Sequence, residues 1–107
     1  MEVFLKSVAA LNDATRVLIL RFLDEHGECC VCDLQQSLNM IQSRLSRHLK
    51  ILKEAGFIRV DRQGTWAYYS IRMPLDLFRS EAIREIKHLD IALPPLKKIS
   101  EIGACKV

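Results

Sequence analysis

The sequence predicts a mainly α-helical domain that carries one small β-hairpin. Apolar residues recur at helical spacing in five successive stretches of the 107-residue chain. Only a few residues separate the third stretch from the fourth, as in a helix-turn-helix. After the fourth stretch, two short runs rich in aromatic and β-branched residues flank a turn, as in a hairpin. A hairpin directly after a helix-turn-helix makes the predicted fold class a winged helix-turn-helix.

The first two helices are predicted from apolar runs near the N-terminus. Apolar residues at positions 3, 4, 8 and 11 predict a first helix that ends near Asn12. Asn12 or Asp13 can cap a second helix, from Ala14 to about Asp24. The apolar residues of this second helix form an almost continuous run, so it should be buried. Gly27 can end it in a left-handed conformation.

The helix-turn-helix is predicted over residues 31–55. Its first helix runs from about Val31 to Leu38, where apolar residues follow helical spacing. Its second helix has an apolar stripe that should face the core, formed by Ile41, Leu45, Leu49 and Leu52.

The opposite face of that second helix carries hydroxyl groups and cations: Ser43, Ser46, Arg47 and Lys50. Residues 41–66 hold six cations and two carboxylates, whereas residues 1–40 hold three cations and six carboxylates. A local basic surface of this kind is expected where a protein meets nucleic-acid phosphates. An ordinary solvated amphipathic helix gives the same pattern, so both interpretations stand at this point.

The rest of the chain is predicted to form the wing, a further helix and a tail. The wing spans residues 57–71, and Arg62 and Gln63 lie at its turn, where they either enter a minor groove or are simply solvated. Residues 94–107 form a tail that could add one more helical turn. The terminal helices, residues 1–11 and 75–93, have more apolar surface than a small domain needs to cover its centre. We therefore expect a homodimer through these helices; their packing on each other within one monomer is the alternative.

Composition narrows the class of protein. The length of 107 residues corresponds to one domain, 1–107, and no 18-residue apolar run predicts a membrane span. Glu2 and Lys6 interrupt the first hydrophobic stretch, which argues against a signal peptide, so a cytoplasmic location is expected. Neither a serine, histidine and carboxylate arrangement nor a phosphate-binding glycine loop is visible, so the chain is not expected to be an enzyme.

Three cysteines crowd the start of the third helix. Cys29, Cys30 and Cys32 lie within four residues, and Cys105 lies near the C-terminus. Unpaired amides at a helix start lower the pKa of a thiol, which favours soft-metal binding by Cys30 and Cys32. On a regular helix, however, residues two apart point about 200° apart, so one ion could bind both only if the first turn is non-helical. Burial as small apolar residues is the alternative. A redox enzyme would place its C-x-x-C motif after a strand, and no strand pattern precedes this one.

Residues 42–58 read Q-S-R-L-S-R-H-L-K-I-L-K-E-A-G-F-I and are followed by R-Q-G-T-W-A-Y-Y-S-I. This stretch resembles the ArsR/SmtB family of metal-responsive winged-helix repressors, and C-V-C-D-L at residues 30–34 resembles the thiol site of its arsenical-resistance repressors. The resemblance implies a homodimer that binds double-stranded operator DNA when ligand-free. It also places His48 near the DNA backbone or inside the protein, and we expect a structural histidine. It places four residues at the major groove: Gln42, Ser43, Ser46 and Arg47.

The resemblance further implies an arsenic-resistance repressor that needs no cofactor and is released when As(III) or Sb(III) binds cysteine thiolates. Gln35 stands where such repressors carry a third cysteine. The third ligand to join Cys30 and Cys32 must therefore come from elsewhere, and we expect Cys105, with Cys29 as the alternative. A response to cadmium, lead or zinc, a thiol-redox or persulfide response, and an architectural DNA-binding domain without a ligand remain alternatives.

Overall fold

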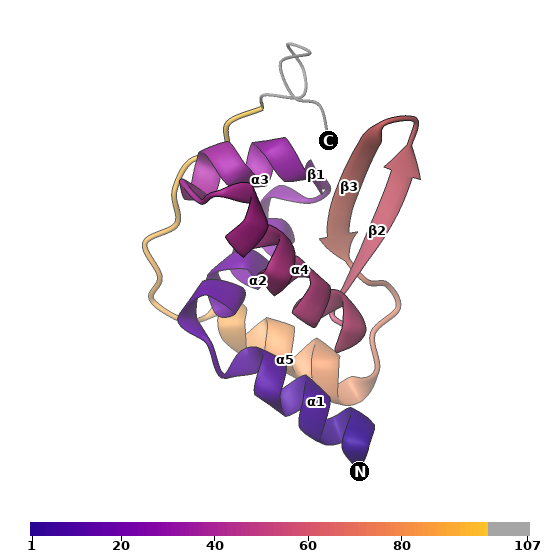
Figure 1. Cartoon of the computed structure of the whole chain (residues 1–107). Coiled ribbons are helices and arrows are strands. Elements are labelled where there is room, and N and C mark those ends of the chain that lie inside the picture. The colour runs from indigo at the N-terminus through magenta and orange to yellow at the C-terminus, as the bar shows by residue number, and fades with distance from the viewer. Residues whose placement is uncertain (99–107) are drawn as a thin grey trace.

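The computed structural model describes residues 1–98, and Figure 1 shows its elements in chain order. The elements are α1 (Glu2–Leu11), α2 (Ala14–His26), β1 (Cys29–Cys30), α3 (Val31–Leu38), α4 (Gln42–Glu54), β2 (Ile58–Gln63), β3 (Trp66–Ile71) and α5 (Leu77–Lys87). This order confirms the predicted class, which is mainly helical with a hairpin after a helix-turn-helix.

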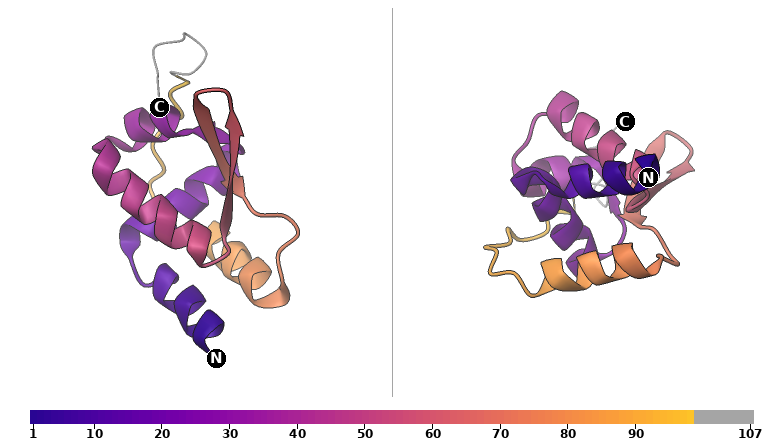
Figure 2. Two further views of the ribbon diagram at one scale, coloured as in Figure 1. Left: turned by 45° about the vertical axis from the view of Figure 1, so that its right-hand side comes forward. Right: turned by 90° about the horizontal axis from the view of Figure 1, so that it is seen from below.

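The helix α2 lies in the centre of the fold, where Figure 2 shows other helices on more than one side of it. The later part of its apolar run is buried as predicted, and Ile19, Leu20 and Phe22 have no exposed surface. At the start of the run, Val17 and Leu18 are half-buried. The side chain of Asp13 accepts a hydrogen bond from the backbone N–H of Arg16 at 3.0 Å and so caps the helix start.

The helix-turn-helix consists of α3, a short turn and α4. Asn39 ends α3 in the left-handed region with φ 52°, and the N–H of Met40 donates to the carbonyl of Gln35. The three leucines of the predicted stripe on α4 have no exposed surface. Ile41, which was predicted to face the core with them, is 68% exposed instead. It is the extended N-cap residue outside α4, so the helical angle that aligned it with the leucines does not apply.

The three strands form one antiparallel sheet in the order β1-β3-β2. The hairpin β2–β3 is the predicted wing, with Gln63 paired to Trp66 beside the turn. The strand β1 was not predicted. Its two residues, Cys29 and Cys30, pair with Tyr69 and Tyr68 of β3. Two residues are too few to show the alternation that identifies a strand in sequence.

The helix α5 occupies residues 77–87 of the predicted 75–93 segment. Asp76 caps its start by accepting from the N–H of Arg79 at 3.0 Å. Residues 89–98 then cross back toward α3 without helical structure. We call this segment the return strap. Its Leu93 and Leu96 pack against the core, and the N–H of Lys97 donates to the hydroxyl of Ser37 on α3 at 2.7 Å.

Arg79 joins α5 to α1 and to the end of α4. Its guanidinium donates to the hydroxyl of Ser7 at 2.6 Å and to the carbonyl of Ala55 at 2.9 Å. It also bonds the carboxylate of Asp76 at 2.6 Å and lies 5.7 Å from the centre of the Phe57 ring. Among the residues described, no helix has both the length and the apolar character needed to cross a membrane.

Candidate nucleic-acid interface and thiol site

The outward face of α4 is basic and open to solvent. The three leucines turn inward, so the polar residues between them point out. Ile41 makes no side-chain cap at the start of α4, so the first amides of the helix lack a side-chain acceptor and are suited to an anion. All seven predicted DNA-contacting residues are exposed: Gln42, Ser43, Ser46, Arg47, Lys50, Arg62 and Gln63.

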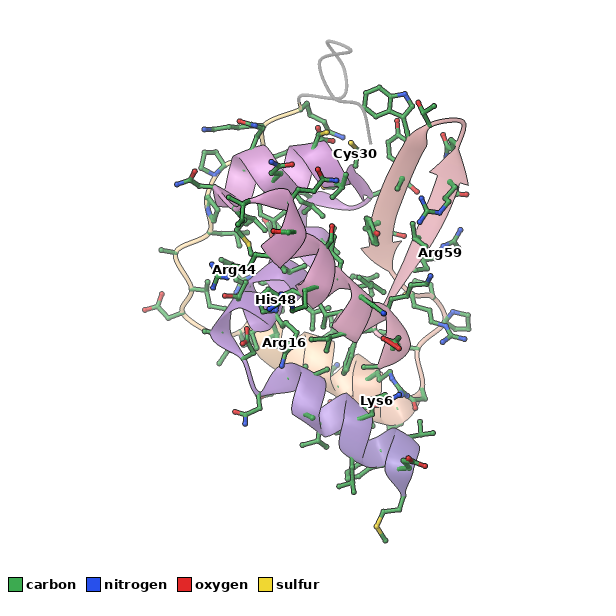
Figure 3. The ribbon with its side chains drawn as sticks, viewed as in Figure 1. Lys6, Arg16, Cys30, Arg44, His48 and Arg59 are labelled. Atoms are coloured by element: carbon green, nitrogen blue, oxygen red, sulfur yellow. The ribbon has the colours of Figure 1, made fainter. Side chains whose placement is uncertain are left out.

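Two exposed residues beside this surface were missed by the sequence analysis. Ile41 precedes α4 with most of its side chain in solvent, and an exposed apolar group at such a position can contact a thymine methyl in a major groove. The signal for it was an apolar residue where a helix normally has a polar N-cap. Arg59 is exposed on β2 toward the base of the wing (Figure 3).

The wing turn is exposed, and its polar side chains are arranged partly by local contacts. The amide of Gln63 donates to the carboxylate of Asp61 at 3.1 Å, while Arg62 is exposed next to it. A cation at the tip of a projecting hairpin can reach a nucleic-acid backbone or minor groove. Both interpretations from the sequence, a groove contact and a solvated turn, are compatible with this exposure.

His48 lies on the inner edge of α4 and is mostly buried, as expected for a structural histidine. Its side chain is 12% exposed, and its Nδ1 lies 3.3 Å from a guanidinium nitrogen of Arg16 and 4.0 Å from the carboxylate of Asp13. Burial lowers the pKa of His48. Asp13 opposes that shift, whereas Arg16 and the arginines at positions 44 and 47 reinforce it.

The thiol site is built differently from a regular helical turn. Cys30 is the N-cap of α3, with extended backbone angles, and its sulfur accepts the N–H of Cys32 at 3.3 Å. The carboxylate of Asp33 in turn accepts the N–H of Cys30 at 3.4 Å, which completes a capping box. The sequence analysis allowed one ion to bind both cysteines only if the first turn is non-helical. Because Cys30 precedes the helix, the 200° separation of a helical pair does not apply.

Cys29 has a different environment from its neighbours. It is fully buried in β1, and its thiol donates to the carbonyl of Gly27 at 3.4 Å. Burial raises the pKa of the Cys29 thiol to about 11, and the charges of Asp33 and Glu28 act in the same direction, while Lys98 opposes them. At neutral pH Cys29 is therefore a protonated thiol, which is a poor metal ligand.

The third predicted ligand, Cys105, lies outside the described residues. Within residues 1–98, no group of three or more histidine, cysteine, aspartate or glutamate side chains is placed to hold a metal ion. The structure thus brings Cys30 and Cys32 together at the start of α3. It also brings the return strap to α3 through the bond between Lys97 and Ser37.

Comparison with known proteins agrees with this architecture. Residues 13–60 match the family model described as "Bacterial regulatory protein, arsR family". An uncharacterized HTH-type transcriptional regulator of Methanocaldococcus jannaschii is 44% identical over 62 residues, which cover 58% of this chain and 70% of that protein. The arsenical resistance operon repressor of Bacillus subtilis is 45% identical over 62 residues, covering 58% of this chain and 59% of that protein. The arsenical resistance operon repressor of Escherichia coli is 39% identical over 75 residues, covering 70% of this chain and 64% of that protein.

A structural comparison gives the same fold. The homodimeric winged helix-turn-helix DNA-binding domain of a possible ArsR-family regulator from Mycobacterium bovis superposes with a TM-score of 0.66 at 26% identity. The match covers 79% of this chain and 72% of that one. The present chain spans about three fifths of the length of the two arsenical-resistance repressors that it matches. Its sequence, its helix-turn-helix and its wing place the chain in the ArsR family of winged-helix transcriptional regulators.

Proposed function

We propose that this protein is a homodimeric repressor of an arsenic-resistance operon. It binds operator DNA when ligand-free and leaves it when As(III) or Sb(III) binds the thiolates of Cys30 and Cys32. One observation carries the proposal: the sulfur of Cys30 caps α3, the helix directly before the basic helix α4. A ligand that takes this sulfur acts on the support of the DNA-contacting helix.

Operator binding follows from the exposed face of α4. The helix presents Ser46, Arg47 and Lys50 outward, and the wing presents Arg62 at its turn. A helix of this kind fits the major groove, where arginine can donate two hydrogen bonds to a guanine edge while the other cations contact phosphates. The uncapped amides at the start of α4 supply a further site for a phosphate.

Arg47→Ala is expected to weaken operator binding by about 1 to 3 kcal/mol, because it removes a bidentate base contact. Fluorescence anisotropy on the DNA upstream of the gene measures the loss. Arg84→Ala is the matched control, since Arg84 is 71% exposed on α5 and its removal takes away the same charge elsewhere. Equal affinities for the wild type and Arg47→Ala would refute the base contact.

The homodimer is supported by unpaired apolar surface on the terminal helices. On α1, Val3 is 70% exposed, Leu5 56% and Val8 42%, and on α5 Leu77 is 79% exposed. The rings of Phe4 and Phe78 pack 5.2 Å apart, so α1 and α5 do contact each other within the monomer as the alternative required. That contact leaves the apolar groups above in solvent, and a two-fold partner would bury them. The Mycobacterium bovis relative is homodimeric.

Leu5→Glu is expected to convert the dimer to monomers at micromolar concentration, because it places a charge in an apolar interface. Sedimentation velocity measures the change in mass. Gln36→Glu, an equal charge change at an exposed position of α3, should leave the dimer intact. A Leu5→Glu variant with the same sedimentation coefficient as the wild type would show that the dimer interface does not include Leu5.

The proposed release mechanism is a change at the start of α3. In the described state, Cys30 holds the first turn through the N–H of Cys32 and through the carboxylate of Asp33. Cys32 is disulfide-bonded in this structure, so As(III) would act on the reduced protein. There, bonds from the thiolates of Cys30 and Cys32 to As(III) would draw the two sulfurs to a common centre and replace this cap geometry. A ligand shifts DNA occupancy only by its differential affinity for the two arrangements. The α3–α4 unit is the element that both the ligand and the DNA act on.

We assign the third thiolate to Cys105. The return strap is bonded to α3 at Lys97, and Lys98 is close enough to Cys29 for its charge to lower the pKa of that thiol. Cys105 lies seven positions after Lys98, and seven extended residues reach about 23 Å. A ligand from the same subunit is therefore within reach. The raised pKa and full burial of Cys29 disfavour it as the third ligand.

The test is an arsenite titration of the reduced protein bound to fluorescent operator DNA, followed by anisotropy. Release at stoichiometric arsenite supports the proposal, and tight binding at every arsenite concentration refutes it. Parallel titrations with cadmium, lead and zinc test the other thiolate-binding metals. Titrations with peroxide and polysulfide test the thiol-redox and persulfide alternatives. These alternatives predict that the protein leaves the DNA on addition of peroxide or polysulfide but not on addition of arsenite.

A further inference from the structure

Ile41 is a large apolar side chain that is exposed at the start of the basic helix α4. It is 68% exposed, whereas the side chain of Met40, the residue before it, packs against the core. The turn from α3 therefore directs one of two consecutive apolar side chains inward and the other outward. Exposure of an apolar group of this size to water is unfavourable. A partner that covers the Ile41 side chain would remove this cost.

The backbone on both sides of Ile41 is held by hydrogen bonds. The carbonyl of Ile41 accepts the N–H of Leu45 at 3.1 Å, and the N–H of Met40 donates to the carbonyl of Gln35 at 3.1 Å. The backbone angles of Ile41 itself are extended, with φ −73° and ψ 148°. Isoleucine is also branched at Cβ, which restricts its χ1 rotamers. A side chain held in this way loses little conformational freedom when a partner packs on it.

Three other helices carry a hydrogen-bonding side chain at the position that Ile41 occupies in α4. Asp13, Cys30 and Asp76 are the N-caps of α2, α3 and α5, and the side chain of each accepts a backbone N–H. Isoleucine has no acceptor, so α4 begins without such a bond. Its presence thus weakens the helix start and also exposes apolar surface. Neither effect stabilises the monomer, which favours a contact between Ile41 and a partner.

The dimer proposed above does not account for the exposure of Ile41. The apolar groups assigned to the dimer lie on α1 and α5. Figure 1 shows the start of α4 beside α3, away from α5 and from the start of α1. Ile41 is instead followed by Gln42 and Ser43, which are exposed on the face proposed to bind the operator. In a major groove, the apolar group that a base edge presents is the 5-methyl group of thymine.

We propose that Ile41 packs on the 5-methyl group of a thymine in each half of the operator and makes the protein prefer thymine at that base pair. The proposal rests on the operator binding proposed above and adds a determinant of sequence preference to it. Gln42 and Arg47 can recognise base edges through hydrogen bonds, whereas Ile41 recognises a group that makes none. One methyl group removed from water by this contact corresponds to a preference of about fourfold in each half-site.

Deoxyuridine tests the contact because it lacks only the methyl group of thymine and keeps the same hydrogen-bonding groups. Each thymine of the operator is replaced in turn, at the equivalent position of both half-sites, and affinity is measured by fluorescence anisotropy without arsenite. At one position the wild type should bind the substituted duplex about fifteenfold more weakly, because both half-sites lose the contact. Ile41→Ala should bind the thymine and deoxyuridine duplexes of that position equally well.

Two further variants test whether the preference belongs to the side chain of Ile41. Ile41→Ser places a favoured N-cap residue at the start of α4, so it should be at least as stable to thermal unfolding as the wild type. It should nevertheless bind the two duplexes equally well. Met73→Ala is the matched control, because it shortens another apolar side chain, 71% exposed in the segment before α5. This control should keep the wild-type preference for thymine.

The possible results separate this contact from the proposed function. A methyl preference that is present in the wild type and absent from both Ile41 variants supports the contact. A wild type that distinguishes no thymine from deoxyuridine overturns the contact and leaves operator binding intact. Retention of the preference in Ile41→Ala or Ile41→Ser overturns it as well, because another side chain would then recognise the methyl group. A wild type that binds none of the duplexes refutes both the contact and the proposed function.

Discussion

Cys30→Ser is expected to bind the operator as the wild type does and to remain bound when arsenite is added. Serine is a favoured N-cap residue, so its hydroxyl can accept the N–H of Cys32 and keep α3 capped. A hydroxyl is not a thiolate ligand for As(III), so the release should be lost completely over the arsenite range that frees the wild type. Anisotropy with operator DNA measures both properties in one titration.

The same titration on the other cysteines completes the assignment. Cys32→Ser should also lose release, and Cys105→Ser should lose it or shift it to higher arsenite. Cys29→Ser is the matched control and should respond as the wild type does, because Cys29 is buried with a thiol pKa of about 11. Normal arsenite release from Cys30→Ser would contradict the proposed ligand set. Loss of DNA binding in that variant would mean that the sulfur does more than cap the helix.

Gly56→Ala is expected to lower the free energy of unfolding by about 2 to 4 kcal/mol, for two reasons. Gly56 has φ 84°, a conformation that costs a residue with a side chain about 1 to 2 kcal/mol. In addition, a Cβ there would lie 2.9 Å from Nε of Arg79. Arg79 cannot simply withdraw, because its guanidinium is held by Ser7, Ala55 and Asp76. Urea denaturation at fixed protein concentration measures the change.

Gly64→Ala separates the two costs. Gly64 in the wing turn has φ 65°, and nothing lies within 4 Å of the position of its Cβ. This variant should therefore pay only the conformational cost. If Gly56→Ala and Gly64→Ala lower the free energy of unfolding equally, the close contact with Arg79 adds no cost of its own. A double-mutant cycle of Gly56→Ala with Arg79→Met gives the coupling directly, because removal of the guanidinium should relieve part of the alanine penalty.

The sequence predicted the parts of this fold that depend on long, regular patterns. The leucines of α4 recur over eight residues, from Leu45 to Leu52, at a spacing that aligns them only on a helix. The aromatic strand after the wing turn has few other interpretations. The outward residues of α4 followed from the same periodicity. For this reason the helix-turn-helix, the wing and the exposure of the predicted DNA-contacting residues agree with the structure.

The parts that could not be predicted depend on single residues and on contacts between distant segments. The strand β1 is two residues long and exists only because β3 pairs with it. Ile41 and Cys30 both fall one residue outside a helix, where the periodic angle no longer places the side chain. The bond between Arg16 and His48 joins positions 32 residues apart. No local pattern could reveal that a cation of α2 contacts a histidine on α4.

The return strap has a consequence for the order in which the protein is made. The bond between Lys97 and Ser37 joins residues 60 positions apart, so this contact of α3 can form only after residue 97 has left the ribosome. During synthesis Cys30 and Cys32 therefore leave the ribosome well before the return strap can pack on α3. A nascent chain would meet arsenite or an oxidant with these cysteines in place before residues 93 and 96 had packed. The cellular thiol environment during translation thus bears on how much repressor is formed in its DNA-binding state.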